Sequence, residues 1–147
     1  MIPLRNILLA ALLFLTVFSV FGQQTANIAL EIQSVEGTNG QLIIGIFDNP
    51  IDFKNKEHPY KAVKLNITDS KVLYKFSDIP NGNYALAVFH DANTDGKMNV
   101  KSMKIPVEGV GTSGVMPKMR APKFADAKFS LENDTLIVIR LMYPAKE

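Results

Sequence analysis

Oxygen-bearing side chains recur at alternate positions in one short segment, His90 to Asn99. Asp91, Asn93 and Asp95 come first, and Gly96 follows where a sharp turn is easiest. Calcium-binding loops use this order, because a tight turn brings carboxylate, amide and carbonyl oxygens to one point. The segment therefore predicts a weak Ca²⁺ site. Its expected ligands are Asp91, Asn93, Asp95, Lys97 (through its backbone carbonyl) and Asn99.

The match to a helix–loop–helix calcium site is partial. Such a loop needs a bidentate Glu at its twelfth position, where this chain has Ser102, and no helical pattern flanks the segment. The same residues also suit a turn closed by hydrogen bonds from its own Asp and Asn side chains to the backbone. The sequence leaves both interpretations open.

A second candidate site is the methionine-rich segment 98–123, which is long and contains several Gly and Pro residues. Thioether sulfur favours Cu(I), so Met103, Met116 and Met119, with His90, form an alternative copper site in a periplasmic protein. The competing interpretation is that flexible methionine side chains fill irregular loop packing.

A third alternative is a hydrolase of unknown substrate. His90 and Asp91 are neighbours, and Ser113 would complete a nucleophilic triad. However, Ser113 lies in a Gly-Thr-Ser-Gly sequence, which lacks the spacing of a G-x-S-x-G nucleophile turn. We therefore expect a protein that is not an enzyme.

The elements that must position these residues have the period of β-strands. Apolar residues alternate with polar ones, or form short apolar runs, in segments of strand length. We expect strands at 28–32, 42–47, 63–67, 72–76, 84–89, 129–131 and 135–143. Both faces of 84–89 are apolar, so this strand is predicted to be central.

Turn signals separate these strands. Gly37 to Gly40, Asp78 to Gly82 and Glu132 to Asp134 are rich in Gly, Pro, Asn and Asp. Asp52 and Phe53 are expected to start a single helical turn. About seven short strands with regular turns predict an all-β fold, a single antiparallel β-sandwich of the immunoglobulin-like or transthyretin-like kind.

Composition sets further limits. The chain has 147 residues, a formal charge of +2 and no cysteine. The length suits one domain, and the balanced charge argues against a nucleic-acid partner. Without cysteine, disulfides, zinc–thiolate sites and cysteine nucleophiles are excluded.

Residues 1–22 have the pattern of a secretory signal peptide. Arg5 precedes an apolar run from Ile7 to Val20, and Gly22 ends the segment before Gln23. No later segment is apolar enough to be a transmembrane helix. We therefore expect an exported protein, in the periplasm, at the cell surface or outside the cell, whose β-sandwich domain spans residues 23–147.

Several blocks of the sequence resemble the domain of unknown function 2141 family of small secreted bacterial proteins. The most specific block continues from a strand into the candidate loop. The blocks are Gly40–Leu42 with Phe47 and Phe53, Phe76–Asp91, Asn93–Asn99, Ile105–Ser113, and Phe124–Ala127 with Phe129. The resemblance implies a β-sandwich and an exported location, and it brings no established activity.

Taken together, these patterns favour an exported, non-enzymatic binding or structural module. Its partner, an unidentified protein or glycan, would meet it through the long segment 98–123 or a sheet edge. Ca²⁺ at Asp91–Asn99 would stabilise the domain.

Overall fold

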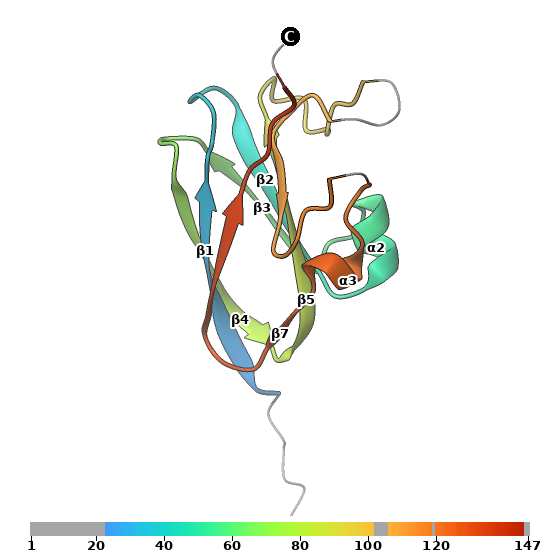
Figure 1. Ribbon diagram of the computed structural model, residues 1–147. Coiled ribbons are helices and arrows are strands. Elements are labelled where there is room, and N and C mark those ends of the chain that lie inside the picture. The colour runs from blue at the N-terminus through green and yellow to red at the C-terminus, as the bar shows by residue number, and fades with distance from the viewer. Residues whose placement is uncertain (1–22, 102–105, 119, 146–147) are drawn as a thin grey trace, which may run out of the picture.

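The computed structural model describes residues 23–101, 106–118 and 120–145. Within them the chain forms eight strands and two short helices, arranged as two facing sheets (Figure 1). The predicted all-β sandwich is confirmed, with one strand more than expected. The predicted signal peptide lies outside the described residues.

The first sheet has the strand order β4-β1-β8. It consists of β4 (Val72–Pro80), β1 (Thr25–Gln33) and β8 (Thr135–Arg140). β1 and β4 are antiparallel, but β1 and β8 run parallel, with Ile28 opposite Thr135 and Gln33 opposite Arg140. This pair departs from the wholly antiparallel prediction. The two strands come from opposite ends of the chain, so no hairpin sets their relative direction.

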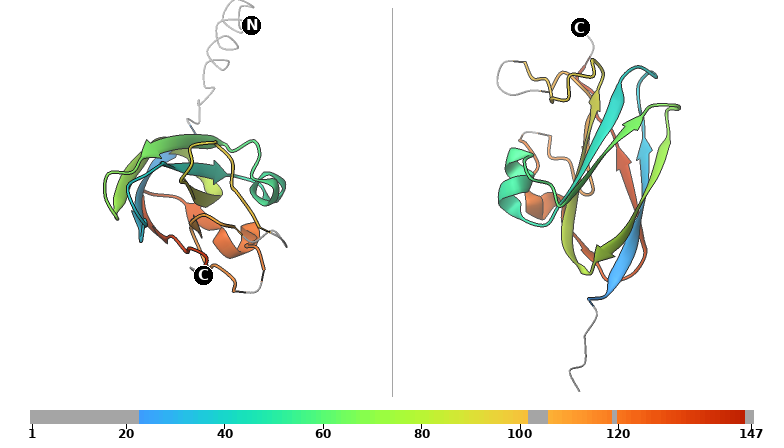
Figure 2. Two further views of the ribbon diagram at one scale, coloured as in Figure 1. Left: turned by 90° about the horizontal axis from the view of Figure 1, so that it is seen from above. Right: turned by 180° about the vertical axis from the view of Figure 1, so that it is seen from behind.

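The second sheet has the order β3-β2-β5-β6, and all of its pairs are antiparallel. Seen from above, it faces the first sheet, and the helices lie on its outer side (Figure 2). Its strands are β3 (Lys61–Asn66), β2 (Gln41–Phe47), β5 (Gly82–Asp91) and β6 (Val110–Thr112), with β7 (Phe129–Leu131) also paired to β5. The helices are α2 (Pro50–Asn55) and α3 (Phe124–Ala127).

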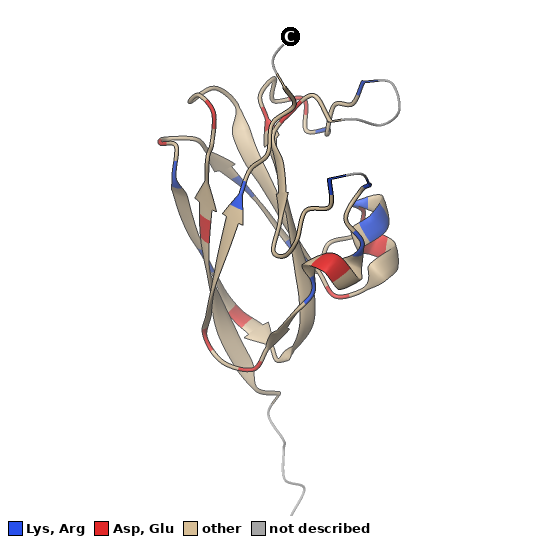
Figure 3. Ribbon diagram, in the orientation of Figure 1, with Lys and Arg blue, Asp and Glu red and all other residues tan. Residues whose placement is uncertain are grey.

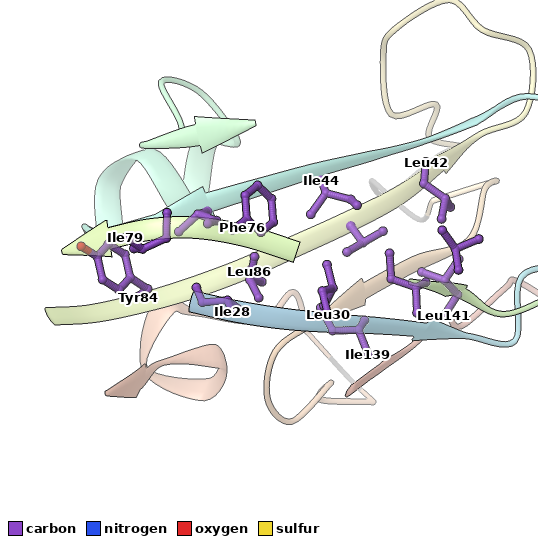
Figure 4. Close-up of a cluster of buried hydrophobic side chains, with 14 of the residues drawn as sticks. Ile28, Leu30, Leu42, Ile44, Phe76, Ile79, Tyr84, Leu86, Ile139 and Leu141 are labelled. Carbon is purple, nitrogen blue, oxygen red and sulfur yellow. The ribbon is translucent and has the colours of Figure 1, made fainter. Parts of the chain in front are cut away.

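The main core lies between the sheets. The predicted alternation in β1 is confirmed, because Ile28, Leu30 and Ile32 are almost completely buried in the core. Figure 4 shows Ile28 and Leu30 among the side chains of this core. β5 is central, as predicted. Its Leu86 enters this core, whereas its Ala85 joins a smaller apolar cluster with Phe47, Phe53 and Ala127 under the helices.

Two local predictions need correction. The expected turn Asp78–Gly82 is mostly strand, since β4 continues through Pro80 and the chain turns only at Asn81. The reason is burial: Ile79 lies fully inside the core, and this packing outweighs the turn-forming residues around it. The predicted loop 98–123 contains the short strand β6, whose Gly111 is opposite Val88.

The helical turn expected at Asp52 and Phe53 is confirmed as α2. Asn49 caps it by accepting hydrogen bonds from the N–H groups of Ile51 and Asp52, and Pro50 opens the first turn. Phe53 is fully buried and packs edge-on against Phe47, which attaches the helix to the second sheet.

Candidate functional site

The candidate loop begins where β5 ends. Asp91 is the last residue of β5, and its side chain is completely buried. Gln41, its direct partner on β2, donates a hydrogen bond from Nε2 to Asp91 Oδ2 at 2.8 Å. The sheet therefore positions the first residue of the loop before the loop itself starts.

The carboxylate of Asp91 folds the loop back on itself. Oδ1 accepts from the N–H of Asp95 at 3.1 Å, and Oδ2 accepts from the N–H of Gly96 at 2.9 Å. Gly96 has a φ of 77°, which a glycine adopts without strain. Burial alone raises the pKa of Asp91, but the hydrogen bonds from Gln41, Gly96 and Asp95 together hold that pKa below its ordinary value.

Asp95 organises the outer part of the loop. Its Oδ1 accepts from the N–H of Lys97 at 2.8 Å, and its Oδ2 accepts from the side-chain amides of Asn93 at 3.0 Å and Asn99 at 3.1 Å. Asn93 Oδ1 in turn accepts from the N–H of Asp95 at 3.2 Å. The five predicted residues thus come together, and Lys97 takes part through its N–H group, which donates to Asp95.

Glu108 holds the two ends of the loop and was not anticipated from the sequence. Its Oε1 accepts from the N–H of Ala92 at 3.0 Å, and its Oε2 accepts from the N–H of Asn99 at 3.1 Å. The side chain is buried. Nothing in its local sequence marks it, because the contacts span nine to sixteen residues.

The hydrogen bonds within Asp91–Asn99 match the turn interpretation, because Asp and Asn side chains accept from backbone N–H groups of the same segment. The calcium interpretation depends on which oxygen atoms are left for a metal ion. Within the described residues, no three His, Cys, Asp or Glu side chains are grouped as metal ligands usually are. Asn99 Oδ1 is buried and has no hydrogen-bond partner. Ser102, at the twelfth position, lies outside the described residues.

His90 has a structural environment on the opposite face of β5 from Asp91. Its Nε2 lies 2.8 Å from the carbonyl of Asn39 and its Nδ1 lies 2.9 Å from the hydroxyl of Tyr143. A carbonyl only accepts, so Nε2 carries the proton and Nδ1 of the neutral ring accepts from Tyr143. Both ring nitrogens are therefore engaged.

The residues of the suggested triad are not brought together. His90 and Asp91 point to opposite faces of β5, as adjacent strand residues do. Ser113 Oγ donates to the carbonyl of Ala127 at 2.6 Å and accepts from the N–H of Leu86 at 2.8 Å. Each of the three side chains serves a different structural contact.

The methionine site cannot be assembled from the described residues. Met103 and Met119 lie outside them, while Met98 is partly exposed and Met116 is half-buried. The copper alternative therefore stays a prediction. His90, its fourth suggested ligand, would have to give up one of its two hydrogen bonds to bind a metal.

A shallow apolar cavity of about 110 Å³ lies on the outer face of the second sheet. Its lining includes Ile43, Phe89 and Met98, with Lys56 at its rim. Lys56 Nζ donates to the carbonyl of Phe53 and lies 3.6 Å from the centre of the Phe53 ring. Burial of this ammonium group against the ring lowers the pKa of Lys56 to about 8.

These features define a class of small β-sandwich domain in which buried carboxylates close one end loop. A family model described as "Uncharacterized protein conserved in bacteria (DUF2141)" matches residues 30–138, and the chain belongs to this family. The resemblance drawn from the sequence is thereby confirmed. No curated protein and no solved structure matches the chain.

The described part of the chain contains no helix that could span a membrane. Neither α2 nor α3 has the length or the apolar character needed to cross a bilayer.

Proposed function

We propose that this protein is an exported, non-enzymatic binding or structural module. One observation carries the proposal: the buried histidine and carboxylate side chains among the described residues, His90, Asp91 and Glu108, all hold the loops at one end of the sandwich. Such contacts build a rigid surface. A protein or glycan partner would meet the module at these loops or at a sheet edge.

We further propose that Ca²⁺ binds at Asp91–Asn99 and stabilises the domain. Support comes from the amides of Asn93 and Asn99, whose N–H groups both point at Asp95 Oδ2. Turning either amide by 180° would place its oxygen beside that carboxylate, as a cation requires. The unpaired Oδ1 of Asn99 favours this change, whereas Asn93 would lose its bond from the N–H of Asp95.

The test is a calorimetric melt of the purified protein, first with a chelator and then with 10 mM Ca²⁺, about 100 times a dissociation constant of about 0.1 mM. Binding to the native state alone then adds about 2.7 kcal/mol, which raises Tm by several degrees. Mg²⁺ is the ion control. Asp95→Asn removes an exposed loop carboxylate and should abolish the shift, whereas the exposed Glu57→Gln should keep it.

An unchanged Tm in Ca²⁺ would contradict the calcium proposal and leave the loop as a turn closed by its own side chains. The non-enzymatic proposal has a separate test. Turnover of any substrate that is lost in His90→Ala but kept in His58→Ala would contradict it.

A further inference from the structure

β8 lies at an edge of the first sheet, and its sequence is Thr-Leu-Ile-Val-Ile-Arg. The other long edge strands carry residues that discourage pairing with a foreign strand. β3 has Lys61 and Lys64, and β4 has Lys75 and Pro80. Of the described edge strands, β8 is therefore the one that is long, apolar and free of both lysine and proline.

Backbone directions show which groups of β8 face outward. The N–H of Leu141 donates to Gln33 on β1, whereas the N–H of Met142 donates to Val110 on β6. Successive residues of a strand direct their N–H and C=O groups to opposite edges. The N–H and C=O groups of Leu136 and Val138 therefore point away from β1, and they have no hydrogen-bond partner among the described residues.

The side chains of this edge are apolar on both faces. Leu136 is 62% exposed and Val138 is 49% exposed on the outer face of the sheet. Ile137 points toward the core but is only partly buried, because the edge beside it is open. Figure 3 shows β8 uncharged along most of its length, with a positive charge at its C-terminal end, which is Arg140.

We propose that β8 is a self-association edge, at which two copies of this chain pair their β8 strands antiparallel across a two-fold axis. Ile137 then lies opposite Ile137 of the second copy, and Leu136 lies opposite Val138. The outward N–H and C=O groups of Leu136 and Val138 bond reciprocally. The two three-stranded sheets become one continuous sheet.

Charge complementarity selects this register and this occupant. With Ile137 at the axis, Asp134 at the start of each β8 lies opposite Arg140 at the end of the other. Within one copy the Asp134 carboxylate accepts from Asn27 and the Arg140 guanidinium donates to Gln33, so the ion pair between copies adds to these contacts. A shift that places Val138 at the axis would instead put Leu136 opposite Arg140. It would also require Met142 to face the second copy, although Met142 is already bonded to Val110 of β6.

This inference deepens the proposed function by naming a second copy as a partner of the module. The experiment is sedimentation equilibrium of the full exported protein from about 1 µM to about 1 mM, in the presence of a chelator. The expected result is a concentration-dependent dimer. Because the chelator removes Ca²⁺, failure of the dimer and failure of the calcium proposal are distinguishable.

The matched variants are Val138→Lys and Leu73→Lys. Both residues are exposed on the same face and lie on either side of Glu31 in the sheet, but Leu73 is on β4 and not at the proposed interface. Val138→Lys should weaken the dimer at least about tenfold, because the lysine meets an apolar partner strand. Leu73→Lys should leave the dimer unchanged.

The register is tested by cross-linking, since the natural chain contains no cysteine. Ile137→Cys should form a disulfide-linked dimer under mild oxidation, because cross-strand partners lie within disulfide reach. Thr135→Cys, which would face Ile139 in this register, should not. A monomer over the whole concentration range, equal loss of the dimer in Leu73→Lys, or a monomer that binds only foreign extended peptides would each overturn the proposal.

Discussion

Gln41 and Asp91 are direct partners across β2 and β5, and the amide of Gln41 donates to the carboxylate of Asp91 at 2.8 Å. The bond connects the loop to the sheet, because the same carboxylate also accepts from Asp95 and Gly96. The loop is thus held at its base by the sheet and at its two ends by Glu108.

Asp91→Asn tests the base of the loop. One carboxylate oxygen becomes an NH₂ group that faces existing N–H donors, so we expect a loss of about 2–3 kcal/mol in the free energy of unfolding. Urea unfolding followed by circular dichroism measures the change. Glu57→Gln, at an exposed carboxylate, should stay within about 0.5 kcal/mol of the natural protein. A comparable change in both variants would contradict the assigned role.

Glu108→Gln tests the two ends of the loop. The amide keeps one acceptor oxygen and loses the other, so one of the two N–H groups at Ala92 and Asn99 is released. We expect a stability loss of about 1–2 kcal/mol. Hydrogen exchange should accelerate at Ala92 or Asn99, while the N–H of Gly96, which Asp91 holds, serves as the internal control.

Gly40→Ala and Gly37→Ala form a matched pair in the connection between β1 and β2. Both glycines have positive φ, 82° and 77°, so an alanine costs about 1–2 kcal/mol in backbone strain at either position. At Gly40 the added Cβ would also lie 2.2 Å from the carbonyl oxygen of Asp91, whereas at Gly37 it meets no atom within 4 Å. Thermal unfolding should show a clearly larger loss for Gly40→Ala. Equal losses would show that the close approach is relieved without cost.

The lowered pKa of Lys56 should make the free energy of unfolding increase as the pH rises above about 8. Its pKa is lowered to about 8 in the folded chain and is about 10.4 in the unfolded chain, so the unfolded state holds more protons between these values. Stability therefore increases through this window. Lys56→Gln should remove that part of the rise in Tm, and Lys54→Gln, on the same helix, should keep it. A rise that survives in Lys56→Gln would contradict this assignment.

Arg120 should contribute fully to stability above about pH 4, and this contribution should fall progressively as the pH drops further toward the lowered pKa of Asp126. Its guanidinium donates to both carboxylate oxygens of Asp126 at 2.6 and 2.8 Å, and this holds the pKa of Asp126 well below its usual range. A lowered folded-state pKa gives stability that is present above the unfolded value and is lost on acidification. Arg120→Gln should therefore lower Tm at pH 6, with a difference that starts to shrink below about pH 4 and continues to shrink on further acidification. A difference that is constant with pH would contradict an ionic origin.

The strands were predictable because burial on one face imposes a period of two, as at Ile28, Leu30 and Ile32. The parallel pairing of β1 with β8 was not, because alternation does not specify the direction of a partner. β6 was not predicted either, because it has only three residues and shows no apolar alternation. Its residue opposite Val88 is Gly111, which has no side chain to mark a strand face.

The candidate loop was predictable because its residues are contiguous from Asp91 to Asn99. Its supports were not, because Gln41 and Glu108 are distant in sequence and become neighbours only through strand pairing and the return of the chain before β6. The spacing of the residues predicted which side-chain oxygens lie close together in this loop. It did not predict which N–H groups donate hydrogen bonds to those oxygens.

The parallel contact between the first and last strands gives the domain a mechanical character. β1 and β8 share six register pairs from Ile28–Thr135 to Gln33–Arg140, and both strands run the same way (Figure 1). Tension applied through the two chain ends pulls β1 backward and β8 forward along their common axis. The hydrogen bonds between them are then loaded together in shear rather than opened one at a time, so a tethered copy of this domain should resist stretching as a single unit.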